Sequence, residues 1–261
     1  MSRIGSAFSN GKAFIPFLTA GDPSLERTEE FILEMIKAGV DMVEIGIPFS
    51  DPIAEGPVIQ EADNRALASG TTVGGIFEMV RSLREKTDIP LVFMTYLNPV
   101  FKYGYEEFFG RCETCGIDGI IIPDLPFEEK GEVEPFARRH GVDLVSLIAP
   151  TSDERIKSIA KSASGFLYVV SSLGVTGIRS EIKTDLRSMV EKVRAVSCVP
   201  AAVGFGVNTP EQAREIAGIA DGVIVGSAFV RIIAEHKDAS GPHIYRYAKT
   251  MKEAVAAVCS E

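Results

Sequence analysis

Two carboxylates stand close together where a short apolar run of the chain gives way to a proline-rich loop. Glu44 lies inside the apolar run, and Glu55 follows in the loop after Asp51. Alternation along a strand would put Glu44 on the face opposite its two neighbours, and Glu44 must be buried if the strand is covered on both sides. A buried carboxylate needs a partner or a function, and carboxylates can act as general acid and base. A structural Glu, held by an Arg or a helix N-terminus, is the alternative.

Alternating strand and helix patterns run along the whole chain and must position these acids. Besides the run with Glu44, apolar runs predict strands at residues 13–19, 91–95, 119–122, 144–148, 166–170, 200–203 and 222–225. A helix-ending Gly followed by a tight turn into a strand recurs at residues 39–41, 116–118, 141–143 and 218–221. The repetition predicts an α/β fold, a single (β/α)8 TIM barrel over residues 1–261, with a short N-terminal helix and extra C-terminal helices. A doubly wound sheet is the alternative, but no G-x-G-x-x-G follows the first strand.

The ends of the seventh and eighth predicted strands carry glycines suited to binding an anion. Gly204-Phe205-Gly206 follows the seventh strand, and Gly226-Ser227 opens a helix after the eighth. A barrel of this kind binds phosphate there, with backbone amides and a helix N-terminus. Glycines needed only for turn geometry are the alternative. The Gly-Val-Thr-Gly stretch at 174–177 adds flexible amides beside the same site and is typical of a lid.

The residue types that are absent from the predicted strand ends exclude some classes of reaction. No lysine lies at any of them, which argues against a Schiff-base aldolase. No cluster of His, Asp and Glu has metal-ligand spacing there. Cys112 and Cys115 fall inside a helical pattern, which favours small core residues over a metal site. A phosphate-bearing substrate, handled by carboxylates as general acid and base, remains.

Composition limits the partners and the location. With 46% hydrophobic and 24% charged residues among 261, the chain has the composition of an ordinary globular protein. A net charge of −9 argues against nucleic acid or an anionic membrane as a partner. No apolar run reaches membrane-spanning length and no signal peptide is recognisable, so we expect a cytoplasmic protein.

The acidic stretch itself resembles a known family. Residues 44–52, Glu-Ile-Gly-Ile-Pro-Phe-Ser-Asp-Pro, and 55–57, Glu-Gly-Pro, closely resemble the signature of the tryptophan synthase alpha subunit. Further motifs of that family follow in order at residues 17–23, 94–99, 124–126, 174–177, 204–206 and 225–228. The resemblance implies a TIM-barrel lyase that cleaves indole-3-glycerol phosphate to indole and glyceraldehyde 3-phosphate, by retro-aldol chemistry, in L-tryptophan biosynthesis. Another phosphate-binding barrel isomerase or lyase, and a non-catalytic activator of a beta subunit, are the alternatives.

The resemblance also implies roles for single residues. Glu44 is the acid/base at indole C3 and at the glycerol hydroxyl. Glu55 occupies the place of a second carboxylate, usually Asp, which stabilises charge at the indole N–H; the extra methylene puts its role in question. The implied substrate-binding residues, near the indole ring, the substrate or its phosphate, are Phe17, Ile59, Tyr168, Thr176, Gly177, Phe205, Gly206, Gly226 and Ser227.

A partner follows from the same resemblance. Family members form an α2β2 complex with a beta subunit that holds pyridoxal phosphate, so this chain would need no cofactor of its own. Segments that match contact regions contain exposed prolines and an Asn, which we expect on rigid loops. The interface residues implied are Asp51, Pro52, Asn98, Pro99 and Pro126.

Overall fold

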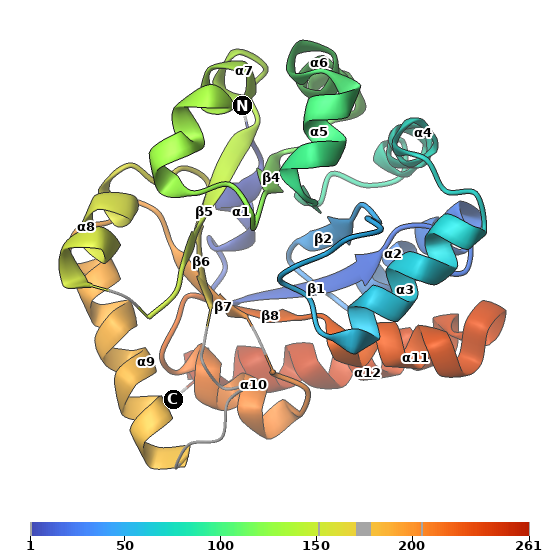
Figure 1. The fold of residues 1–261 in the computed structure, drawn as a ribbon. Coiled ribbons are helices and arrows are strands. Elements are labelled where there is room, and N and C mark those ends of the chain that lie inside the picture. Colours follow the sequence, from blue (N-terminus) through green and yellow to red (C-terminus); the bar gives the residue numbers. More distant parts are fainter. Residues whose placement is uncertain (1, 151, 171–178, 205, 261) are drawn as a thin grey trace.

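Eight parallel strands, hydrogen-bonded in sequence order, form a closed barrel in which β8 pairs with β1 (Figure 1). The computed structural model describes residues 2–150, 152–170, 179–204 and 206–260. The strands are β1 (Ala13–Thr19), β2 (Val43–Gly46), β3 (Leu91–Met94), β4 (Gly119–Ile121), β5 (Asp143–Ile148), β6 (Leu167–Val170), β7 (Ala201–Gly204) and β8 (Gly222–Val225). The predicted (β/α)8 barrel is confirmed.

Helices surround the barrel (Figure 1), and the predicted short N-terminal helix and extra C-terminal helices are both present. The α-helices are α1 (Ile4–Ala7), α2 (Leu25–Lys37), α3 (Pro57–Ala68), α4 (Val73–Arg84), α5 (Leu97–Tyr103), α6 (Tyr105–Cys115), α7 (Glu134–Arg139), α8 (Asp153–Lys161), α9 (Arg179–Arg194), α10 (Pro210–Ala217), α11 (Ser227–His236) and α12 (Gly241–Ala256). Short 3₁₀ helices are η1 (Phe127–Glu132), η2 (Lys237–Ala239) and η3 (Ala257–Ser260). In the described part of the chain, no helix is both long and apolar enough to cross a membrane.

One prediction of local structure is wrong. Asn98 and Pro99 were expected on a loop, but both lie in the first turn of α5. Proline is tolerated there because the first backbone N–H groups of a helix have no partner within it. The free N–H of Leu97 instead donates to the Asp124 carboxylate, at 2.8 Å, so the segment after β4 caps the helix after β3.

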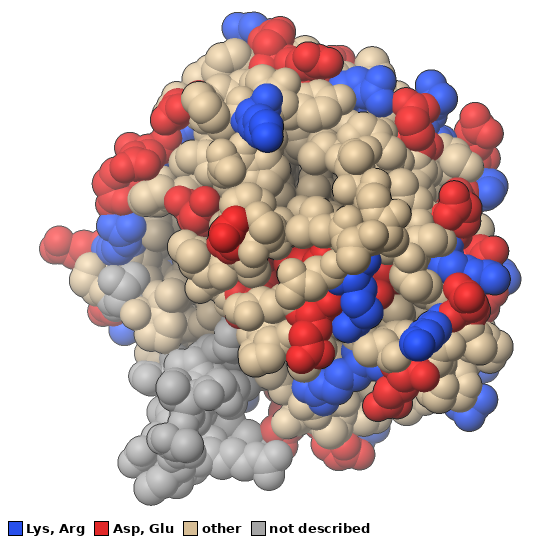
Figure 2. Space-filling model, turned by 45° about the vertical axis from the view of Figure 1, so that its right-hand side comes forward, with Lys and Arg blue, Asp and Glu red and all other residues tan. Residues whose placement is uncertain are grey.

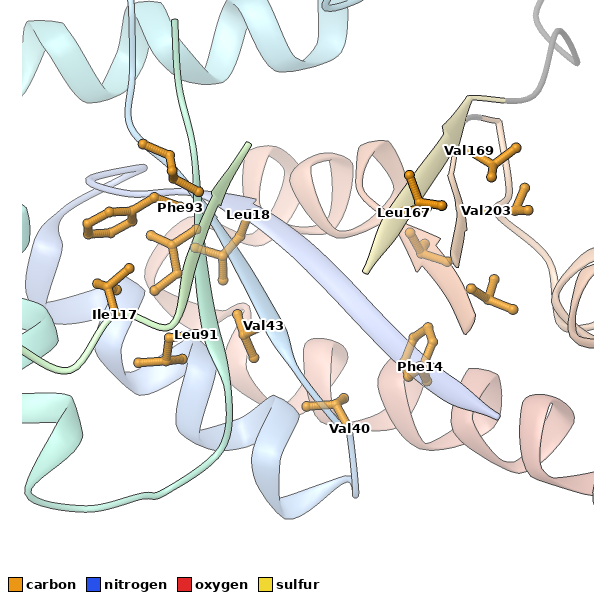
Figure 3. Packing of buried hydrophobic residues seen from close by; sticks show 14 of the residues in the cluster. Phe14, Leu18, Val40, Val43, Leu91, Phe93, Ile117, Leu167, Val169 and Val203 are labelled. Atoms are coloured by element: carbon orange, nitrogen blue, oxygen red, sulfur yellow. The ribbon is translucent and has the colours of Figure 1, made fainter. Parts of the chain in front are cut away.

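Side chains alternate across the barrel wall, as predicted for β2. Val43 and Ile45 belong to the large apolar layer between strands and helices, whereas Met42 packs into the barrel interior. Figure 3 shows part of the outer layer, with Phe14 and Leu18 of β1 among its members. Glu44, between Val43 and Ile45 in sequence, therefore faces the interior.

The Gly-containing turns link neighbouring strands at the amino-terminal end of the barrel. Three of them end in an Asp whose carboxylate accepts a backbone N–H at the start of the preceding strand: Asp41 from Phe14 at 2.7 Å, Asp118 from Leu91 at 3.0 Å and Asp221 from Ala201 at 2.9 Å. The N–H of each Asp donates back to the carbonyl of the same residue. Each turn thus joins two neighbouring strands by a pair of hydrogen bonds before the parallel ladder begins.

Candidate active site

A cavity of about 240 Å³ lies at the carboxyl ends of the strands. It is lined by Phe17, Glu44, Ala54, Glu55, Gly56, Ile59, Met94, Tyr168, Gly206, Val207, Asn208, Ile224, Gly226, Ser227 and Arg231. Every predicted catalytic or substrate-binding residue that the structure describes is among them. Thr176, Gly177 and Phe205, which were predicted with them, lie outside the described residues.

Glu44 reaches this cavity from β2, and its environment is unusual for an acid. Its exposed fraction is 1%, and neither carboxylate oxygen has a hydrogen-bond partner among the described residues. Burial, and secondly the nearby charge of Glu55, raise the pKa of Glu44 to about 8. No Arg or helix N-terminus within the described chain pairs with it, so a purely structural role has no support there. Glu44 carries a proton at neutral pH and can act first as an acid.

Glu55 enters the cavity from the loop after β2, and Tyr96 holds it there. The Tyr96 hydroxyl donates to the Glu55 carboxylate and accepts the backbone N–H groups of Ile53, at 2.9 Å, and Ala54, at 2.8 Å. Burial raises the pKa of Glu55, while the hydrogen bond from Tyr96 acts in the opposite direction. One buried hydroxyl therefore fixes both the loop and its carboxylate.

The sequence did not reveal this role of Tyr96. Its position directly after a predicted strand was the only signal, and the partner lies 41 residues earlier in the chain. A hydroxyl suits the position because it can donate and accept at once, whereas carboxylate and backbone N–H can each do only one.

Glycines make room for two aromatic side chains at the cavity. A Cβ on Gly204 would lie 2.3 Å from the Tyr168 hydroxyl, and a Cβ on Gly46 would lie 2.7 Å from the Phe17 ring. Phe17 sits beside Glu44 in the β1–β2 register. Burial, and next the charge of Glu44, raise the pKa of Tyr168 well above its usual value, so the phenol stays neutral.

The residues predicted to bind an anion form part of the cavity wall. Gly226 is the N-cap of α11, and Ser227 begins this ten-residue helix, so backbone N–H groups and the positive end of the helix face the cavity. Gly206 adds backbone with a φ of 78°, a conformation that favours glycine. Arg231 also lines this wall, and the sequence analysis had not singled it out.

The predicted interface residues lie outside the cavity, on segments that follow β2, β3 and β4. Asp51, Asn98 and Pro126 are exposed, while Pro52 and Pro99 are half-buried. Two large apolar side chains on the same segments are also exposed: 79% for Ile53 and 64% for Phe101. Exposed apolar side chains on adjacent segments are typical of a protein–protein contact.

A second cavity, of about 250 Å³, lies between β4, β5, η1 and α8. Its two basic lining residues are already paired, Lys130 with Glu134 at 3.1 Å and Arg155 with Glu128. It contains no described acid–base group free to act. Cys112 and Cys115 are buried free thiols in α6, as predicted for core residues.

Comparison with known proteins gives a consistent result. Residues 6–258 match the family model described as tryptophan synthase alpha chain. The tryptophan synthase alpha chain of Lacticaseibacillus casei is 49% identical over 98% of this chain and 97% of its own length, and that of Lactiplantibacillus plantarum is 50% identical over the same shares. The crystal structure of the alpha subunit from Legionella pneumophila superposes with a TM-score of 0.90, at 38% identity, covering 98% of this chain and 99% of that one. A chain in the crystal structure of a tryptophan synthase complex from Pyrococcus furiosus superposes with a TM-score of 0.84, at 35% identity, covering 94% of this chain and 99% of that one.

Proposed function

The chain belongs to the tryptophan synthase alpha chain family, and we propose that Glu44 and Glu55 carry out its reaction in the cavity at the barrel's carboxyl end. The protein is a lyase that cleaves indole-3-glycerol phosphate to indole and glyceraldehyde 3-phosphate, the alpha reaction of tryptophan biosynthesis. The observation that carries the assignment is Glu44: a buried acid with a pKa of about 8 and no partner among the described residues, in one cavity with a second carboxylate and the proposed anion-binding residues.

The first step needs an acid and a negative charge. Protonated Glu44 gives its proton to indole C3, which turns the ring into a cation with its charge centred on N–H. Ionised Glu55 stabilises that charge as it develops. The hydrogen bond from Tyr96 favours this ionised form of Glu55 and holds it in place before the substrate arrives.

The second step returns the proton. Glu44, now a carboxylate, accepts the proton of the hydroxyl on the carbon bonded to C3. The carbon–carbon bond breaks, its electron pair neutralises the ring cation, and the former carbinol becomes the aldehyde of glyceraldehyde 3-phosphate. Protons balance over the cycle, because Glu44 ends as it began. A single group with a pKa near the working pH suits both transfers.

Substrate placement follows from the remaining cavity walls. Phe17 and Ile59 would flank the indole ring, and Tyr168 would lie close to the substrate beside Glu44. Gly206, Gly226 and Ser227 would hold the phosphate through backbone N–H groups, which bind anions without a compensating charge. Thr176, Gly177 and Phe205 complete the assignment by their match to the family's motifs.

A beta subunit is the proposed partner, in an α2β2 complex that holds pyridoxal phosphate in the beta chain. The family structure from Pyrococcus furiosus is a tryptophan synthase complex. The docking surface would include Asp51, Pro52, Asn98, Pro99 and Pro126, and the exposed Ile53 and Phe101 support it. We expect residues 1–261 to act there as one cytoplasmic domain.

Charge on the described surface agrees with a protein or small-molecule partner more than with a nucleic acid. Acidic and basic side chains are interspersed over the face that Figure 2 shows, without a continuous basic patch among its described residues. The net charge of the chain is −9. A nucleic-acid site would require clustered Lys and Arg.

Indole release from indole-3-glycerol phosphate, followed with and without a beta subunit, tests the function. We expect turnover by the chain alone and faster turnover in the complex. Stimulation of the beta reaction without any indole release would identify a non-catalytic activator. Isomerisation of a sugar phosphate without indole release would identify another kind of barrel enzyme.

A further inference from the structure

One charged residue of the cavity is not used by the proposed mechanism. The described lining contains two acids, Glu44 and Glu55, and a single base, Arg231. By contrast, Arg65 in the last turn of α3 is paired with Asp22 at 2.7 Å. The Arg231 guanidinium interacts electrostatically with the Tyr247 hydroxyl but has no ion pair or hydrogen bond among the described residues, and the side chain is exposed. A guanidinium without an anionic partner on the wall of an enzyme cavity is available to a ligand.

Helix geometry directs this side chain toward the anion-binding wall. Arg231 lies four residues after Ser227 on α11, so the two share one face of the helix. Long side chains on a helix lean toward its N-terminus, which here is the end that carries Gly226 and Ser227. The same cavity lining includes all three residues. The guanidinium can therefore reach an anion held at the first turn from its solvent side.

The charges in the cavity indicate what Arg231 could bind. A phosphate ester is largely a dianion at neutral pH, and it must enter a site that also holds ionised Glu55. Backbone N–H groups and a helix end supply only partial positive charge, equivalent to about half an elementary charge. A guanidinium supplies a full charge and two parallel donors that match phosphate oxygens.

We infer that Arg231 binds the outward oxygens of the substrate phosphate and makes the site selective for a dianionic phosphate. This inference rests on the proposed function, since it concerns the same phosphate. Arg231 is then a specificity-determining residue: it strengthens binding of the phosphate group and takes no part in moving protons at the indole ring.

Direct binding of glycerol 3-phosphate, measured by calorimetry on the complete chain, tests the inference. Arg231→Gln should raise the Kd about five- to tenfold, and Arg231→Lys, which keeps charge but loses the fork, should raise it less. Added salt should weaken binding more steeply in wild type than in Arg231→Gln. Arg246→Gln is the matched control, because Arg246 is an exposed residue of α12 outside the described cavity lining.

Kinetics separate this role from a structural one. Arg231→Gln should raise KM for indole-3-glycerol phosphate with kcat within about twofold, and should leave cleavage of the dephosphorylated substrate, indole glycerol, unchanged. Equal affinity of Arg231→Gln and Arg246→Gln for glycerol 3-phosphate would overturn the inference while the lyase assignment stands. Failure of the wild type to cleave indole-3-glycerol phosphate at all would overturn the lyase assignment, and this inference with it.

Discussion

The two ends of the barrel treat buried carboxylates in opposite ways. At the amino-terminal end, Asp118 is 2% exposed and accepts the backbone N–H groups of Arg3 and Leu91 and a guanidinium N–H of Arg84. At the carboxyl end, Glu44 is 1% exposed and has no partner among the described residues. Two equally buried acids thus differ: Asp118 has hydrogen-bond and ion-pair partners, and Glu44 has none among the described residues.

The difference separates stability from chemistry within one fold. An acid with cations and N–H donors around it has its charge compensated and ties strands together. An acid without them keeps its proton, at some cost in stability, until a substrate can take it. The barrel can place the second kind only at the end where loops and a cavity admit a substrate.

Replacing Glu44 gives the largest expected effect on rate. Glu44→Gln keeps the shape of the side chain but cannot move a proton, so kcat for indole release should fall by about 10²–10⁴-fold. The variant should fold, because no described ion pair or hydrogen bond of Glu44 is lost. A variant with wild-type kcat and an unchanged pH profile would remove Glu44 from the mechanism.

The same variant should change how stability depends on pH. Glu44 ionises near 4.5 in the unfolded chain and near 8 in the folded protein. Between these values ionisation stabilises only the unfolded chain, so the wild-type free energy of unfolding falls as pH rises, by about 1.4 kcal/mol per unit and about 5 kcal/mol in all. Glu44→Gln lacks this loss.

Urea unfolding of both proteins from pH 4.5 to pH 8.5 measures the difference. The free energy of unfolding of Glu44→Gln, relative to wild type, should rise across this range and level off above about pH 8. Asp63, whose pKa burial and the charge of Glu55 raise to about 7, titrates in both proteins, so the difference isolates Glu44. If the difference in free energy of unfolding did not depend on pH, Glu44 would not be a buried acid that keeps its proton in the folded protein.

At the amino-terminal end of the barrel, Asp118→Asn should lower stability and leave the rate nearly unchanged. The variant leaves Arg84 and Arg3 without their buried partner, so the free energy of unfolding should fall by about 3 kcal/mol. The kcat per folded molecule should stay within about twofold, because Asp118 lies at the far end of the barrel. If Asp118→Asn lost rate as Glu44→Gln does, the separation of the two ends would fail.

Residues at the two ends also differ in how far the sequence predicts them. The period of two along a strand predicted that Glu44 lies on the face opposite Val43 and Ile45, and the recurring Gly turns predicted the barrel. The structure shows that this face is the barrel interior. The contacts of the Asp carboxylates at the amino-terminal end could not be predicted, because the sequence of a turn that ends in Asp does not reveal which residue the Asp will contact. Arg3, for example, lies 115 residues before Asp118. Likewise Pro99 predicts a loop from sequence alone, whereas the structure has it in the first turn of α5, where Pro also fits.

Substitutions of Glu55 test whether this Glu, in the place where the family usually has Asp, acts as the second carboxylate of the site. Glu55→Gln removes the charge and should lower kcat about a hundredfold, and Glu55→Ala at least as much. Glu55→Asp should stay within about tenfold of wild type, which is about 1.4 kcal/mol of barrier. The expected order is Glu ≥ Asp ≫ Gln ≥ Ala, measured as indole release with the beta subunit present. A fully active Glu55→Ala would leave Asp51 as the next candidate.

Removing the Tyr96 hydroxyl should lower kcat less than Glu44→Gln or Glu55→Gln does. Tyr96 holds Glu55 at the carboxyl end of the barrel, as Arg3 and Arg84 hold Asp118 at the amino-terminal end. Tyr96→Phe keeps the ring against Phe49, at a 5.2 Å centroid distance, but loses the donor to Glu55 and the acceptor for two loop N–H groups. We expect kcat to fall about tenfold. The hydrogen bond from Tyr96 lowers the pKa of Glu55, so its loss should move the acidic limb of the kcat–pH profile to higher pH. Tyr105→Phe is the matched control, because it deletes the same atom from a surface bond to Glu132 of 2.9 Å. If the two variants had the same kcat and the same acidic limb, Glu55 would be positioned without Tyr96, and the loop alone would place it.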